Sequence, residues 1–294
     1  MQADQVMWKK YETLKELLSS YESVAVAFSG GVDSSFLLYA AKEALGNRVI
    51  AVTATASWVA TREQKEADDF CRQRNIRHLT CHVQAEEIEQ FRDNPPDRCY
   101  LCKKVLFRKM LELAERQCEG GGFLEVRDRE QCHNPKSVVL VEGSNLDDEG
   151  DYRPGLKALK ELSIVSPLRE AGFTKKEIRA LSKELGLPTW DKPSFACLAS
   201  RFVYGEQITE EKLKMVEQAE DYLYELQFRQ FRVRIHQDMA RIEIPKEDFI
   251  RMASEEVSEA VNRRLKEIGF SYISLDLGGY RMGSMNDSLR DCKK

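Results

Sequence analysis

The chain has 294 residues, which is long enough for two domains, and 42% of them are hydrophobic, which is enough for a substantial core. A formal net charge of −4 argues against a protein that binds nucleic acid mainly by electrostatic attraction. No stretch approaches the roughly 20 apolar residues that cross a bilayer, and no signal peptide precedes the first helical pattern, so we expect a cytoplasmic protein. In that compartment the eight cysteines favour metal or redox chemistry over disulfides.

Apolar runs of strand length alternate with helical patterns through the first half of the chain. After a helical stripe near the N-terminus, strands are predicted at 24–28, 49–54, 77–83 and 138–141. The helices predicted between them span about 36–45, 61–74 and 103–118. This order predicts an α/β fold, a parallel sheet flanked by helices, which binds ligands beyond the carboxyl ends of its strands.

Residues 118–137 interrupt this order with a run of three glycines, scattered charges and an Asn-Pro pair. We expect an exposed insertion, in which Cys132 and His133 would ligate a metal only with partners from elsewhere. The pattern Thr174-Lys175-Lys176-Glu177 predicts a capped helix start.

The chain changes character near residue 205. A long amphipathic helix is predicted from about 209 to 226. Two strands follow at 231–236 and 241–244, then a helix after residue 245, and a last strand at 272–275. We therefore expect two domains, residues 1–204 and a smaller C-terminal α+β domain at 205–294 that binds substrate or forms an oligomer contact.

The first predicted strand runs directly into Ser29-Gly30-Gly31-Val32-Asp33-Ser34-Ser35, after which a helix begins. Glycines let the backbone approach a ligand closely, and serine hydroxyls add to the unpaired amides of a helix N-terminus. Such an end attracts anions, so the loop is a predicted phosphate site. It lacks the Lys-Ser/Thr pair of a Walker loop and resembles the SGG-x-DS loop of enzymes that split ATP into AMP and pyrophosphate. An ordinary capped strand–helix turn is the alternative.

Cys99 and Cys102 form a C-x-x-C pair at the start of a predicted helix. Such a pair can hold zinc, ligate an iron–sulfur cluster or cycle as a dithiol. Cys197 is the best candidate for a third ligand, because it lies in an irregular segment near the cation Arg201, which would favour a thiolate. Three thiolates would leave one iron of a [4Fe-4S] cluster open to an exogenous sulfide. A structural pair with a buried Cys197 is the alternative.

Arg232, Arg234 and His236 alternate along a predicted strand, so their side chains project from one face of it. Guanidinium groups at this spacing can clamp a phosphate or a carboxylate. Ser200 and Arg201 offer a second anion contact close to Cys197. A solvated strand face is the alternative.

Several motifs together resemble the LarE family of ATP-dependent sulfur transferases, which help to build the nickel-pincer nucleotide cofactor. The similarity covers almost the whole chain, whereas the phosphate loop alone is shared with GMP synthetase, NAD synthetase and tRNA-thiolating enzymes. Besides that loop, the matching stretches are Arg98-Cys99-Tyr100-Leu101-Cys102-Lys103-Lys104, Glu142-Gly143-Ser144-Asn145-Leu146-Asp147-Asp148, Gly150-Asp151-Tyr152-Arg153-Pro154-Gly155, Leu187-Pro188-Thr189-Trp190-Asp191-Lys192-Pro193, Ala196-Cys197-Leu198-Ala199-Ser200-Arg201 and Leu275-Asp276-Leu277-Gly278-Gly279-Tyr280-Arg281.

The resemblance implies that ATP, with Mg²⁺, adenylates a carboxylate of pyridinium-3,5-dicarboxylate mononucleotide and releases pyrophosphate. A sulfur nucleophile then displaces AMP, and two rounds give the bis-thiocarboxylate. The resemblance places ATP at residues 29–35 and at Gly143, with Asp33 also catalytic. It places the substrate at Ser200, Arg201, Arg232 and Arg234. It further implies a sulfide donor and a homo-oligomer.

The same resemblance leaves two routes for the sulfur. In sacrificial members of the family, the cysteine that matches Cys197 gives up its own sulfur and ends as dehydroalanine. Cys99 and Cys102 depart from that pattern, and members with all three cysteines resemble those proposed to hold a [4Fe-4S] cluster with a transferable sulfide on its fourth iron. We favour the cluster because it explains the three cysteines together, and sacrificial transfer from Cys197 is the alternative.

Two further functions stay open. A tRNA thiolase would use the same ATP chemistry, although the acidic net charge and the lack of an evident RNA-binding domain argue against it. A non-catalytic regulator would sense ATP or iron without turnover, so pyrophosphate release separates it from both enzymes.

Overall fold

The computed structural model describes residues 2–119, 138–148, 155–194 and 196–281, which divide into two compact units. The first unit is formed by residues 1–56, 61–88 and 99–194, and the second by 57–60, 89–98 and 195–294. Two short segments from the first hundred residues thus pack with the C-terminal part of the chain. The domain limits 1–204 and 205–294 stay a prediction, and most of the insertion at 118–137, with Cys132 and His133, lies outside the described residues.

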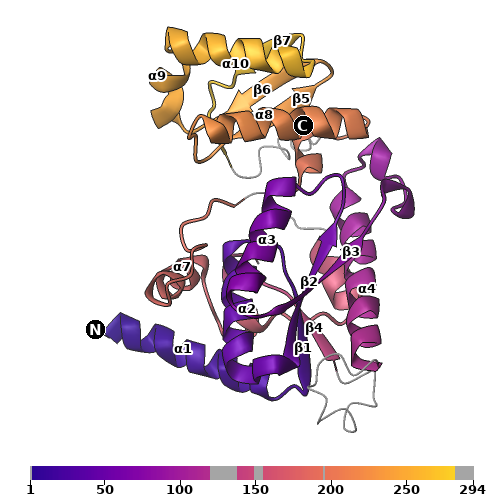
Figure 1. Cartoon of the computed structure of the whole chain (residues 1–294), viewed down its shortest axis with the longest axis vertical. Helices are drawn as coiled ribbons and strands as arrows, with labels where there is room; N and C mark the ends of the chain where they lie inside the picture. The colour runs from indigo at the N-terminus through magenta and orange to yellow at the C-terminus, as the bar shows by residue number, and fades with distance from the viewer. Residues whose placement is uncertain (1, 120–137, 149–154, 195, 282–294) are drawn as a thin grey trace, which may run out of the picture. The chain divides into compact units, whose positions relative to one another are not determined.

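The first unit contains a four-stranded parallel sheet, which confirms the predicted fold class (Figure 1). In the order β3-β2-β1-β4, its strands are β3 (Arg77–His82), β2 (Val49–Thr55), β1 (Ser23–Ala27) and β4 (Val138–Val141). The register places Val24 opposite Val49 and Val139. β1 and β2 are buried along almost their whole length, as their continuous apolar sequences require in a sheet covered on both faces.

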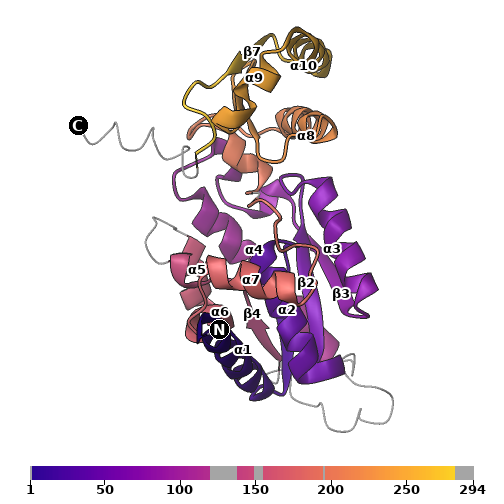
Figure 2. The ribbon, with the colours of Figure 1, turned by 90° about the vertical axis from the view of Figure 1, so that its left-hand side faces the viewer.

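Helices cover both faces of this sheet. The helices of the first unit are α1 (Gln2–Ser19), α2 (Val32–Leu45), α3 (Thr61–Gln73), α4 (Arg98–Glu119), α5 (Gly155–Glu161), α6 (Pro167–Glu170) and α7 (Lys175–Glu184). Two neighbouring residues of β3 show that α3 and α4 lie on opposite faces of the sheet, because successive side chains of a strand point to opposite faces. His78 bonds to Asp68 of α3, and Arg77 bonds to Gln117 of α4. On the α3 side, α2 lies between the sheet and the helices α1 and α7 (Figure 2).

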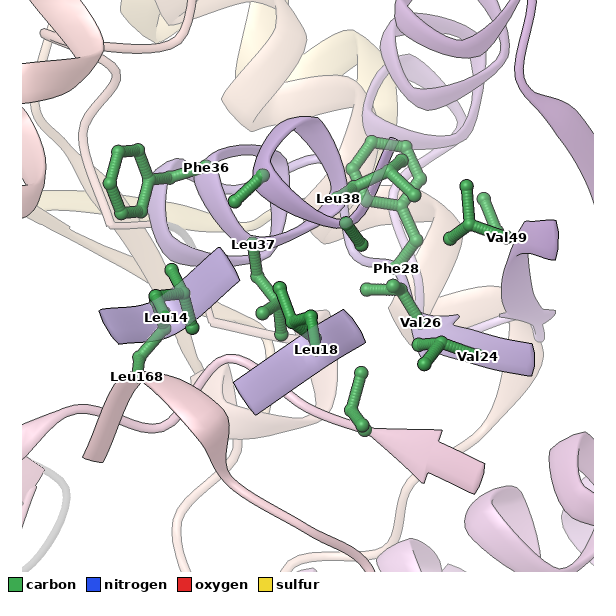
Figure 3. Close-up of a cluster of buried hydrophobic side chains, with 14 of the residues drawn as sticks. Leu14, Leu18, Val24, Val26, Phe28, Phe36, Leu37, Leu38, Val49 and Leu168 are labelled. Atoms are coloured by element: carbon green, nitrogen blue, oxygen red, sulfur yellow. The ribbon is translucent and has the colours of Figure 1, made fainter. Parts of the chain in front are cut away.

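The core of the first unit is centred on α2 (Figure 3). Phe36, Leu37 and Leu38 point to different sides of this helix, and all three are fully buried. One side meets Leu14 and Leu18 of α1, and the other meets the sheet. Each buried leucine or phenylalanine contributes about 1.5–3 kcal/mol, so α2 is held firmly and its N-terminus has a defined position.

The second unit is an α+β arrangement around a three-stranded sheet of order β5-β6-β7. Its strands are β5 (Arg232–His236), β6 (Met239–Glu243) and β7 (Tyr272–Leu275), and its helices are α8 (Glu210–Glu225), α9 (Phe249–Met252) and α10 (Glu255–Ile268). β5 and β6 form an antiparallel hairpin, whereas β7 pairs parallel to β6 after the crossover through α9 and α10. None of the helices in the described ranges is long and apolar enough to cross a membrane.

Candidate active site

The predicted phosphate loop lies at the carboxyl end of β1, between a parallel strand and the N-terminus of α2. Gly30 has a φ of +69°, a conformation that side chains rarely adopt. A Cβ added there would lie 3.3 Å from the Cβ of Ala67 in α3. The loop therefore needs glycine at this position both for its turn and for the close approach of α3.

Hydroxyl groups line the inside of this loop. The Oγ atoms of Ser29 and Ser34 are 3.0 Å apart, and Ser34 Oγ donates to the carbonyl of Gly31 at 3.3 Å. Ser35 is fully buried, and its hydroxyl has no hydrogen-bond partner in the part of the chain that the structure describes. The loop is thus ordered by its own side chains at a helix N-terminus, where an oxyanion is favoured.

Gly143 brings the end of β4 against the same helix N-terminus. A Cβ at this position would lie 3.0 Å from the backbone nitrogen of Ser34 and 3.2 Å from the backbone carbon and Cβ of Asp33. Neighbouring Glu142 is buried and accepts hydrogen bonds from the backbone N–H and hydroxyl of Ser144, at 3.0 and 2.8 Å. The predicted nucleotide contact at Gly143 is therefore adjacent to the loop.

Asp33 connects the loop to a third segment. Its carboxylate pairs with the Lys175 ammonium at the start of α7 and accepts a 3.3 Å hydrogen bond from Asn145 Nδ2. The backbone N–H of Lys175 donates to Asp147 Oδ2 at 2.8 Å, which ties α7 to the segment after β4. Burial raises the pKa of the Asp33 carboxyl, and the Lys175 cation opposes part of that rise.

Two lysines that the sequence does not predict as site residues lie at the loop. One is Lys175, which pairs with Asp33. The other is Lys192, whose ammonium donates to the Gly30 carbonyl at 2.9 Å and pairs with Glu66 at 2.6 Å. In the sequence, Lys175 stands out only as part of a helix start. Lys175 and Lys192 are separated in the sequence by 142 and 162 residues from the loop residues that they contact, so a local sequence pattern does not predict these contacts. Two ammonium groups beside the predicted phosphate loop match the charge of a polyphosphate.

The C-x-x-C pair lies in the first turns of α4. Cys99 is half-buried, Cys102 is buried, and neither forms a disulfide. Their spacing of three places both thiols on one side of the helix, which fits two ligands of an iron–sulfur cluster. No group of three potential metal ligands occurs within the described residues. Cys197 belongs to the second unit, and the three-cysteine ligand set stays a prediction.

In the second unit, Cys197 is half-buried and directly precedes the short 3₁₀-helix Leu198–Arg201. Arg201 is fully buried and donates to the carbonyls of Ala196 and Cys197, at 2.6 and 3.3 Å. Its Nε and Nη2 donate to the two carboxylate oxygens of Glu220, both at 2.8 Å. The guanidinium thus holds the backbone on both sides of the Cys197 side chain.

The two strand arginines are buried, so the alternative of a solvated strand face is wrong. Arg234 pairs with Glu243 at 2.5 Å and donates to the Ser200 carbonyl at 2.9 Å. Arg232 instead stacks on the Tyr280 ring and donates to its hydroxyl at 3.2 Å. Burial and the nearby Arg201 cation lower the pKa of Arg232, whose partner here is the Tyr280 hydroxyl and not a carboxylate. Arg232 is therefore the member of this cluster best suited to receive an anion.

Known proteins are similar to this chain both in the region of the phosphate loop and over almost its whole length. The family model described as asparagine synthase matches residues 11–100, which include the phosphate loop. The chain is 37% identical over 289 residues to a pyridinium-3,5-bisthiocarboxylic acid mononucleotide synthase of Lactiplantibacillus plantarum, with 95% of each chain covered. It is 36% identical to an uncharacterized protein of Synechocystis over 94% of this chain and 97% of the relative. One component of the glutamine-hydrolyzing GMP synthase of Thermoplasma volcanium is 30% identical over 67% of this chain and 61% of the relative. The chain therefore belongs to the LarE family of enzymes.

Proposed function

We propose that this protein is an ATP-dependent sulfur transferase that converts the carboxylates of pyridinium-3,5-dicarboxylate mononucleotide to thiocarboxylates. The observation that carries the proposal is the loop at residues 29–35, whose glycines, hydroxyls and two neighbouring lysines suit a polyphosphate. The printed name of the relative from Lactiplantibacillus plantarum supplies the product class.

In the first step, a carboxylate oxygen of the substrate attacks the α-phosphorus of ATP. The bond from that phosphorus to the bridging oxygen breaks, and pyrophosphate leaves with the electron pair. The amides at the start of α2 bind the pyrophosphate, and Lys175 and Lys192 balance its growing charge. Asp33 would hold Mg²⁺ against the same phosphates, and Lys175 would then pass from Asp33 to a phosphate oxygen.

In the second step, a sulfur nucleophile attacks the acyl carbon, and the carbon–oxygen bond to AMP breaks. Arg232 receives the phosphate or a carboxylate of the substrate, while Arg201 keeps the segment around Cys197 in position. A [4Fe-4S] cluster held by Cys99, Cys102 and Cys197 would supply sulfide. In the sacrificial alternative, Cys197 is the nucleophile, and loss of its Cα proton with cleavage of its Cβ–S bond leaves dehydroalanine.

The experiment that tests adenylation measures pyrophosphate release with and without the dicarboxylate mononucleotide. We expect release that depends on this substrate, and a large loss in Lys175→Met. Lys176→Met, one residue further along the same helix, is the matched control and should retain the rate. Release that depends on tRNA instead would favour the thiolase, and no release with either substrate would refute both enzymes.

A second experiment separates the two sulfur routes. Protein purified without oxygen is analysed for iron and acid-labile sulfide, and Cys99→Ala is compared with the control Cys71→Ala. About four irons per chain, lost only in Cys99→Ala, would support the cluster. Absence of iron, with the loss of one H₂S from Cys197 after turnover, would support the sacrificial route.

A further inference from the structure

A chain of three hydrogen-bonded side chains runs from the surface of the first unit to the phosphate loop. His78 on β3 is mostly buried, and its Nδ1 lies 2.6 Å from Asp68 Oδ1 of α3. Its Nε2 lies 2.7 Å from the hydroxyl of Thr53 on β2. That hydroxyl donates to the backbone carbonyl of Phe28 at 2.7 Å. Phe28 is the residue immediately before the loop at 29–35.

Counting hydrogen atoms shows which protonation state of His78 satisfies all three bonds at once. A backbone carbonyl can only accept, so the single hydroxyl hydrogen of Thr53 is used on Phe28. The 2.7 Å contact with His78 then requires a hydrogen on Nε2. The Asp68 carboxylate also accepts only, so the 2.6 Å contact requires a hydrogen on Nδ1. All three bonds exist together only when His78 is the positively charged imidazolium.

The arrangement fixes the base of the loop. Thr53 holds the Phe28 carbonyl, and the Phe28 ring lies edge-on to the His78 ring, with centroids 6.0 Å apart. α3 supplies both Asp68 and Ala67, and Ala67 packs against Gly30 inside the loop. His78 therefore connects α3, which packs against the loop at Gly30, to the end of β1, from which the loop begins.

We propose that His78, as an imidazolium, is a positioning residue for ATP binding at residues 29–35. The inference rests on the proposed function, because it assigns that loop to ATP. Thr53 is not a nucleophile in this arrangement: it is 6% exposed, and its hydroxyl hydrogen is committed to Phe28. The three side chains act on the backbone of the loop and not on a substrate.

The groups that face His78 come from α3, β2 and β3. From α3 the Asp68 carboxylate faces the ring, and nearby Cys71 stays a neutral thiol because burial, with Asp68, raises its pKa to about 12. From β2 the ring meets the uncharged Thr53. Along β3, His82 lies four residues further on the same face and is paired with Thr55. A neutral His78 ring would leave one of the three bonds without a hydrogen.

Nitrogen NMR of ¹⁵N-histidine-labelled protein tests the protonation state directly. The chain has only four histidines, so the His78 signals can be assigned by their loss in His78→Gln. Two protonated ring nitrogens at pH 7 would support the proposal. One protonated and one bare nitrogen would overturn it, whatever the function of the loop.

ATP affinity, measured by calorimetry, tests the positioning role. We expect His78→Gln and Thr53→Val to bind ATP roughly five- to twentyfold more weakly at pH 7. Thr53→Ser, which keeps the hydroxyl, should bind normally. His82→Gln, the matched His–Thr pair on the same strand face, should also bind like the wild type. Equal loss in His78→Gln and His82→Gln would overturn the proposal.

The Thr53 variants separate this role from a merely structural one. Weak ATP binding by both Thr53→Val and Thr53→Ser would overturn the inference, because the hydroxyl bond to Phe28 would then not matter. Absence of ATP binding by the wild type would instead refute the proposed function of the loop.

Discussion

The contact between Gly143 and the start of α2 can be tested by adding a single methyl group. In Gly143→Ala, the new Cβ would lie 3.0 Å from the backbone nitrogen of Ser34 and 3.2 Å from two atoms of Asp33. Backbone atoms cannot move aside as a flexible side chain does, so we expect overpacking to cost about 1–3 kcal/mol of stability. The methyl group also covers the Ser34 amide. Losing one hydrogen bond to a charged phosphate costs about 1.5–3 kcal/mol, or roughly 10- to 150-fold in ATP affinity.

The assay combines urea unfolding with calorimetric titration by a non-hydrolysable ATP analogue. Gly46→Ala is the control, because Gly46 ends α2 with a φ of +61° and an added Cβ there meets nothing within 4 Å. This control should lose about 1–2 kcal/mol of stability from backbone strain and should bind the analogue normally. Normal binding by a folded Gly143→Ala variant, or equal weakening in Gly46→Ala, would refute the reasoning.

Three further predictions concern charge and burial. Because burial raises the pKa of Asp33, ATP turnover should begin to fall on acidification above about pH 4, near which an exposed aspartate titrates, and a rate–pH profile that is flat down to about pH 4 would contradict this. Glu220→Gln breaks the buried pair with Arg201 and should cost about 3–5 kcal/mol in urea unfolding, whereas a loss below 1 kcal/mol would show that the pair is dispensable. Burial raises the pKa of Cys71 to about 12, so iodoacetamide at pH 8 should label this thiol only after unfolding, as peptide mass mapping will show.

The sequence predicts most elements of the fold, although it misses the short helices α5 and α6 and predicts one helix where α9 and α10 lie. It predicts the last strand at 272–275, and β7 spans those residues. It predicts the helix start at Thr174 from a capping pattern, and Thr174 and Glu177 form both hydrogen bonds of that cap. Periodicity and caps are local properties of the chain, so they are readable before any tertiary contact is known.

The phosphate loop is also readable from the sequence, because its glycines, its hydroxyls and the helix N-terminus are contiguous. The lysines that lie beside the loop cannot be read from the sequence in this way. Lys175 and Lys192 reach the loop across 142 and 162 residues. Lys175 lies in the predicted capping pattern and Lys192 in a stretch that resembles the family, but neither pattern shows that the side chain contacts the loop. The tertiary fold alone brings them there.

The direction of a side chain is likewise decided only by packing. The sequence predicts that Arg201 and Arg234 contact substrate, and the structure places their guanidinium groups in buried pairs with Glu220 and Glu243, with Arg232 left beside Tyr280. Alternation along a strand says which residues share a face, but not what covers that face. The sequence by itself thus determined most of the elements, the loop and the family resemblance. The tertiary structure decided which charges meet, because ion pairs form between atoms close in space, however far apart they lie in the chain.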